Sequence, residues 1–149
     1  MSPLGRLEFL VGELSGREEV TATPWAPGGP AEARASGERA LEGGVLVQHH
    51  VQERDGAVAF RTLNVFTADP ATGDVLLYAF DSVGYPPEPA ARGTWHGDEL
   101  VLERTTERGS ARTTFTATAD GFRWSKSFRA PDADAWSPVV AGELRRTAG

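Results

Sequence analysis

The sequence contains no cysteine among its 149 residues, which excludes disulfides, thiolate metal sites and thiol nucleophiles. It has only one lysine, Lys126, and a net charge of −6. Nucleic acids and anionic membrane surfaces both attract clustered lysine and arginine, so neither is expected as a partner. No apolar run approaches the length of a membrane-spanning helix, and the first residues lack a signal-peptide pattern. A cytoplasmic location is therefore expected.

The remaining composition is that of an ordinary globular protein. Apolar residues make up 40% of the chain and charged residues 24%. A chain of 149 residues is long enough to bury a substantial core. We therefore expect a single domain over residues 1–149.

Short runs of alternating apolar and polar residues fill most of the chain, and turn residues separate them. Asp55-Gly56 and Asp120-Gly121 are examples of these turns, in which glycine supplies a positive φ. Strands joined by tight turns form an antiparallel meander, and closure into a barrel removes its two free edges. We therefore predict an all-β, closed up-and-down barrel, with an open sandwich as the alternative. The ten predicted strands are 13–22, 31–41, 45–54, 57–67, 75–82, 90–96, 99–107, 110–119, 121–129 and 137–146.

The first segment has a different pattern, which predicts a short helix. Ser2 can cap it, Pro3 suits its first position and Gly12 can end it. An apolar stripe along this helix would consist of Leu4, Leu7, Leu10 and Val11.

Five motifs occur along almost the whole chain: Phe9-Leu10-Val11-Gly12-Glu13-Leu14-Ser15-Gly16, Leu41-Glu42-Gly43-Gly44, Asp69-Pro70-Ala71-Thr72-Gly73-Asp74, Phe80-Asp81-Ser82-Val83-Gly84 and Gly93-Thr94-Trp95-His96-Gly97-Asp98. With them the chain resembles an uncharacterised bacterial family of calycin- or lipocalin-like barrels, the domain of unknown function 1579. The resemblance implies a closed barrel with an N-terminal helix near one end, and no established reaction. A related class of barrels binds haem through a histidine on a late strand. Here no histidine lies beyond Trp124, so haem is disfavoured and no cofactor is expected.

Two adjacent histidines lie on the predicted strand 45–54, and neighbours on a strand point to opposite faces. They therefore cannot both ligate one metal ion inside the barrel, and no metal site is expected. His49 shares its face with three valines, which favours His49 as the core histidine. The alternative is a polar cavity lined by Gln48, His50 and Gln52.

The predicted strand 75–82 is apolar on both faces until Asp81 and Ser82. Its outer face should therefore be covered by the helix, a loop or a second subunit, so a homodimer through this strand is possible. Asp81 could face a ligand. We favour the alternative, in which it accepts backbone donors or pairs with an arginine such as Arg61, because an unpartnered buried carboxylate is costly.

Alternation supplies further candidates for a cavity wall. Lys126 shares a face with Phe122, Trp124 and Phe128, where it could bind an anionic group or extend its long stem to the rim. Arg61 shares its face with alanine, leucine and valine side chains. The candidate ligand-binding residues are His50, Arg61, Tyr78, Asp81, Trp124 and Lys126.

No nucleophile elbow, metalloprotease motif or phosphate loop occurs in the sequence, so no catalytic residue is assigned. Glu18 and Glu19 diverge on a strand and do not form an acid–base pair. The predicted function is the binding of a small apolar or amphipathic molecule inside the barrel. The alternatives are a small-molecule enzyme that uses Asp81 with a histidine, and a structural or oligomerisation domain without a ligand.

Overall fold

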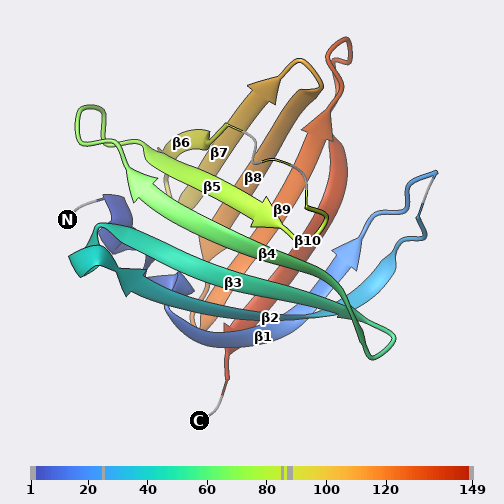
Figure 1. Cartoon of the computed structure of the whole chain (residues 1–149), viewed down its shortest axis with the longest axis horizontal. Coiled ribbons are helices and arrows are strands. Elements are labelled where there is room, and N and C mark those ends of the chain that lie inside the picture. The colour runs from blue at the N-terminus through green and yellow to red at the C-terminus, as the bar shows by residue number, and fades with distance from the viewer. Residues whose placement is uncertain (1–2, 25, 85, 87–88, 148–149) are drawn as a thin grey trace.

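The computed structural model describes residues 3–24, 26–84, 86 and 89–147. Ten consecutive antiparallel strands close into a barrel in which β1 pairs with both β2 and β10 (Figure 1). The predicted closed barrel is confirmed, and the open sandwich is wrong. The strands are β1 (Gly12–Val20), β2 (Gly29–Ala40), β3 (Val45–Arg54), β4 (Ala57–Ala68), β5 (Val75–Asp81), β6 (Ala91–His96), β7 (Glu99–Thr106), β8 (Gly109–Ala117), β9 (Gly121–Arg129) and β10 (Ser137–Arg146).

The pairing between β5 and β6 is the shortest in the barrel. It joins only Val75, Leu76 and Leu77 to residues of β6. The other neighbour of β5 is β4, and that ladder continues as far as Asp81. Among the described residues, the last four positions of β5 therefore have ladder partners on β4 alone. Figure 1 shows β5 ending away from β6 on the front of the barrel.

The segment η1 (Pro3–Leu10) consists of 3₁₀ turns that meet at a kink at Leu7, and it closes one end of the barrel. A 3₁₀ helix has three residues per turn, so leucines spaced by three lie along one edge of it. Those leucines, Leu4, Leu7 and Leu10, are all buried. The predicted helix is thus confirmed in place, with the tighter 3₁₀ form, and its predicted cap Ser2 lies outside the described residues. A second 3₁₀ turn, η2 (Leu41–Gly43), links β2 to β3.

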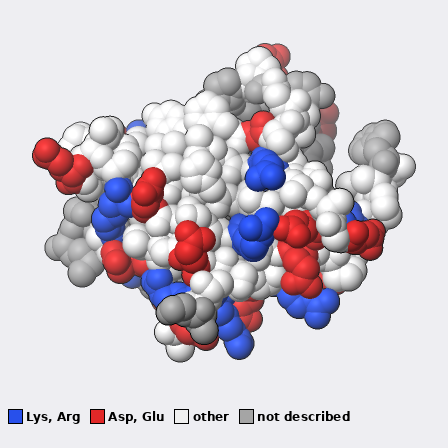
Figure 2. Space-filling model, turned by 60° about the horizontal axis from the view of Figure 1, so that its bottom comes forward, with Lys and Arg blue, Asp and Glu red and all other residues white. Residues whose placement is uncertain are grey.

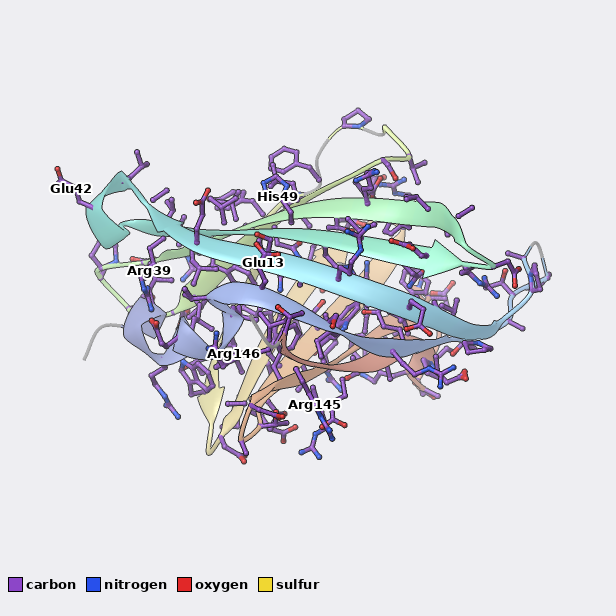
Figure 3. The ribbon with its side chains drawn as sticks, turned by 90° about the horizontal axis from the view of Figure 1, so that it is seen from below. Glu13, Arg39, Glu42, His49, Arg145 and Arg146 are labelled. Carbon is purple, nitrogen blue, oxygen red and sulfur yellow. The ribbon has the colours of Figure 1, made fainter. Side chains whose placement is uncertain are left out.

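Two arginines fasten η1 to the barrel wall from different strands. Arg39 of β2 donates to the carbonyl oxygen of Leu4 and pairs with the Glu8 carboxylate at 2.8 Å. Arg146 of β10 donates to the carbonyl oxygens of Glu8 and Val11. Figure 3 shows both arginines beside the helix. The helix is therefore held by its backbone as well as by its leucines.

The packed core lies in the half of the barrel next to η1. Inward residues of opposing strands meet there, and aromatic rings stack across the interior. Phe115 lies in edge contact with Phe66 at 5.7 Å between ring centroids, and it also contacts Phe122 at 6.1 Å. Fully buried leucines surround these rings, among them Leu46, Leu100, Leu102 and Leu144.

The outer face of β5 stays largely uncovered, because η1 lies at the barrel end. Tyr78 is 41% exposed and Phe80 is 43% exposed on that face. Of the three predicted alternatives, the helix, a loop and a second subunit, the helix does not cover this face. A homodimer contact through residues 75–82 stays a prediction.

Charges on the surface are mixed in sign. In the view of Figure 2, acidic and basic side chains alternate over the lower face. Several of them form ion pairs, such as Arg34 with Glu53 at 2.6 Å and Arg112 with Glu103 at 2.8 Å. In the part of the chain that the structure describes, no helix has the length and apolar character needed to cross a membrane.

Candidate functional site

The barrel interior is packed at the helix end and hollow toward the opposite end. The hollow is a cavity of about 250 Å³. Its apolar lining includes Phe60, Leu77, Ala79, Phe115 and Trp124, and its polar lining includes Gln48, His50, Gln52, Thr62, Asn64, Arg104, Thr113 and Lys126. A mostly apolar cavity with a few placed polar groups is typical of a small-molecule site.

A buried carboxylate joins three strands beside this cavity. Glu18 of β1 is only 2% exposed. Its Oε2 accepts hydrogen bonds from Nε2 of His50 at 2.7 Å and from the indole Nε1 of Trp124 at 2.8 Å. Its Oε1 accepts a hydrogen bond from the Gln52 amide at 2.9 Å. Glu18 therefore fixes the side chains that form much of the polar wall.

Small residues beside Glu18 let its carboxylate reach strands that do not border β1. On β10, Gly142 stands opposite both Glu18 and Trp124. A Cβ atom at position 142 would lie only 2.6 Å from Cγ of Glu18. On the other side, the inward residues of β2 carry only methyl side chains where they face Glu18, Gln52 and His50. These residues are Ala31, Ala33 and Ala35.

The environment of Glu18 favours its ionised form. Burial by itself raises the pKa of a carboxyl group, because it removes the charge from water. The hydrogen bonds from His50, Gln52 and Trp124, together with the electrostatic effect of His50, outweigh that burial and lower the pKa of Glu18 below its ordinary value of 4.5. Glu18 is therefore a fixed negative charge behind the cavity wall, and three donors satisfy its carboxylate.

Two further contacts order the same wall. The Asn64 amide donates to the Gln48 side-chain oxygen at 2.9 Å. The rings of His50 and Trp124 meet edge to face, with 5.4 Å between their centroids. These contacts leave the polar side of the cavity pre-organised rather than free to rotate, which lowers the entropic cost of binding a ligand.

Two basic side chains, Arg104 and Lys126, line the cavity beyond this network. On β9, Lys126 is the next inward residue after Trp124 on the side away from η1, and it pairs in register with Thr113. Burial lowers the pKa of Arg104. Burial also lowers the pKa of Lys126. The positive charge of Arg104 lowers this pKa further, whereas the negative charge of Asp81 raises it. The hydrogen-bonded carboxylate of Glu18 therefore lies behind the cavity wall at one level, and two basic side chains line the cavity at the next level, away from η1.

The structure brings three of the six predicted wall residues into the cavity. His50, Trp124 and Lys126 line it. Tyr78 points to the outer face of β5, and Arg61 is exposed beside a shallow surface hollow, so neither is placed in the cavity wall.

Asp81 ends β5 beside the same shallow hollow and is not part of the cavity lining. Its Oδ1 accepts a hydrogen bond from the backbone N–H of Val83 at 3.0 Å. This contact agrees with the favoured prediction that Asp81 accepts a backbone donor at the strand end. The suggested partner Arg61 instead donates its backbone N–H to the Ser82 hydroxyl.

The preferred assignment of the two histidines is wrong. His49 is exposed on the outer face, labelled in Figure 3, whereas His50 is 7% exposed and faces the cavity. Gln48 is buried on the same inward face as His50. The valine face points outward because the interior here is a polar cavity, in which glutamine and histidine find hydrogen-bond partners.

Sequence reasoning missed two residues of the site, Glu18 behind the cavity wall and Arg104 in the cavity lining. On β1, Glu18 shares its inward face with buried Leu14. Alternation from Leu14 is consistent with an inward Glu18, but the sequence pattern does not show which residues would bind its carboxylate. Arg104 likewise follows buried Leu100 and Leu102 at a spacing of two. In both cases the only signal in the sequence is the spacing of two along a strand, which puts the residue on the inward face.

No family model matches this sequence, and no curated protein matches it. Among solved structures, the chain is similar to that described as the crystal structure of Rv2717c from M. tuberculosis. The TM-score is 0.76 and the sequence identity is 18%, over 99% of this chain and 99% of that chain. Within the described residues, no three histidine, aspartate or glutamate side chains gather as a metal site. By its structure and this comparison, the chain is a closed ten-stranded β-barrel similar in fold to Rv2717c.

Proposed function

We propose that this protein binds a small amphipathic molecule inside its barrel. The observation that carries the proposal is the cavity of about 250 Å³ with a mixed apolar and polar wall. Barrels of small strand number can fill their interior with side chains or hold one small ligand. Here small residues in the cavity lining, such as Ala79, Ala91 and Ala111, leave part of the interior open.

The ordered wall supports binding more than it supports catalysis by Asp81. The enzyme alternative needs Asp81 within reach of a histidine as an acid–base pair. His50 instead has its Nε2 engaged with Glu18 at 2.7 Å. The same engagement does not favour haem ligation through that nitrogen. A ligand-binding barrel without a catalytic pair is the function that these contacts support best.

A fluorescence titration with N-phenyl-1-naphthylamine, a neutral probe of apolar cavities, tests the proposal. Thr113→Phe adds a ring to the cavity wall, whereas Thr114→Phe adds the same ring to the outer face of β8. We expect Thr113→Phe to weaken binding about tenfold or more, equivalent to about 1.4 kcal/mol. We expect Thr114→Phe to bind like the unmodified protein.

Folding of both variants is checked by circular dichroism before titration. Equal loss of binding in the two variants would place the probe outside the cavity and contradict the proposal. A complete lack of binding by the unmodified protein would favour a structural domain without a ligand.

A further inference from the structure

The cavity contains two basic side chains that form no ion pair with any carboxylate in the part of the chain that the structure describes. Arg104 comes from β7 and Lys126 from β9, and both side chains line the cavity. The intervening strand β8 contributes Ala111 and Thr113, which are opposite Arg104 and Lys126 in register. Neither basic group has a hydrogen bond or an ion pair among the described residues. The small side chains between them leave space for a group to be held by both.

The charge around these two side chains is unbalanced. Burial lowers the pKa of each, and the Arg104 charge lowers that of Lys126 further. Asp81 is the acidic group whose charge favours protonated Lys126. Its carboxylate accepts a hydrogen bond from Val83 and forms no ion pair with Lys126 among the described residues. Partly buried cations without a contacting anion are costly, so an anion supplied by a ligand would be stabilising.

The carboxylate behind the cavity wall already has its hydrogen-bond partners. Glu18 accepts hydrogen bonds from His50, Gln52 and Trp124. It therefore has little capacity left for a cationic ligand. A second acidic group on a ligand would also be repelled from that level of the cavity. On the η1 side of Lys126, the cavity wall includes the apolar rings of Phe115 and Trp124, which stack with 6.3 Å between their centroids.

We infer that the ligand of this cavity is a small monocarboxylic acid whose carboxylate is held by Arg104 and Lys126. Its apolar body lies against Phe115 and Trp124, beside Leu77 and Ala79. This inference rests on the proposed function and adds the chemical class of the ligand. It also distinguishes the cavity from one that takes any apolar molecule.

Isothermal titration calorimetry with three eight-carbon probes tests the inference. Octanoate, 1-octanol and octylamine share one chain and differ in the charge of the head group. Hydrogen bonds to charged groups contribute about 1.5–3 kcal/mol, so we expect octanoate to bind about tenfold or more tightly than 1-octanol. Octylamine is expected to bind most weakly.

The double variant Arg104→Gln with Lys126→Gln removes both positive charges. We expect it to lose the preference for octanoate, by about tenfold or more, while 1-octanol keeps its affinity to within about threefold. Arg123→Gln, an exposed position on the same strand as Lys126, serves as the matched control and should change neither affinity. Removal of two partly buried charges should leave the thermal unfolding temperature unchanged or raise it, so the double variant remains testable.

The outcomes separate this inference from the proposed function. Equal affinity of octanoate and 1-octanol in the unmodified protein would overturn the carboxylate site and leave cavity binding intact. Tighter octanoate binding that survives the double variant would also overturn it. Tighter binding of octylamine than of octanoate would also overturn the inference, because it would indicate a cation site that uses Glu18. If neither the three probes nor N-phenyl-1-naphthylamine bound, the proposed function itself would fail.

Discussion

Glu18→Leu is expected to lower the free energy of unfolding by about 3 kcal/mol, because it leaves buried donors without an acceptor. The donors are the His50 ring nitrogen, the Gln52 amide and the Trp124 indole. Leucine occupies a similar volume, so the loss comes from the polar network rather than from a void. Urea denaturation followed by circular dichroism measures the change.

Two further variants serve as controls for Glu18→Leu. Glu19→Leu makes the same change on the exposed outer face of β1 and should stay within about 0.5 kcal/mol of the unmodified protein. Glu18→Gln keeps one acceptor oxygen and should show an intermediate loss. If Glu18→Leu and Glu19→Leu were equally mild, the network would have no role in stability.

The effect of Glu18→Leu should also depend on pH. The pKa of Glu18 is lower in the folded protein than its ordinary value of 4.5. A carboxyl group of this kind stabilises the fold above its unfolded pKa, and the contribution is lost as pH falls through the folded pKa. The stability difference between the unmodified protein and Glu18→Leu should therefore be constant near neutral pH and shrink below about pH 4.5. A difference that grew on acidification would contradict the assigned direction.

Leu7→Ala is the second substitution with a large expected effect. Leu7 is 0% exposed and lies in the helix that closes the barrel. Truncation of a buried leucine to alanine costs 2–5 kcal/mol, and we expect about 3 kcal/mol here. Thermal unfolding and urea denaturation both measure the loss. Leu41→Ala, at a leucine that is 79% exposed, is the matched control and should have almost no effect.

The same variant tests whether the two ends of the barrel act independently. No described residue of η1 lines the cavity, so folded Leu7→Ala should bind N-phenyl-1-naphthylamine with the affinity of the unmodified protein. Titration at low temperature keeps the variant folded. Loss of probe binding by the folded variant would show that the helix and the cavity are coupled.

The fold could be predicted from the sequence because its signals are local. Turn residues such as Asp55-Gly56 lie where the chain reverses, and the ten predicted strands agree with the observed ones to within two residues at each end. The leucine spacing in η1 gave the buried edge of the helix, although not its 3₁₀ form. The closed topology followed from the order of hairpins.

The site was harder to predict, because it depends on contacts between distant strands. Alternation separates His49 from His50 but does not say which face is inside. The valines favour the His49 face as the inward one. In the structure the His50 face is inward, where His50 donates a hydrogen bond to Glu18. That bond joins residues 32 positions apart and passes over the alanines of β2. The sequence of neither strand alone predicts this hydrogen bond.

The three-residue ladder between β5 and β6 has a consequence for exchange with solvent. Because only residues 75–77 of β5 pair with β6, an opening between these two strands breaks fewer hydrogen bonds than an opening between any other pair. The pair with the fewest bonds separates at the lowest free energy, and here that pair lies beside the cavity residues Leu77 and Ala79. Separation of β5 from β6 is therefore the expected route by which a molecule enters the interior while the rest of the barrel stays folded.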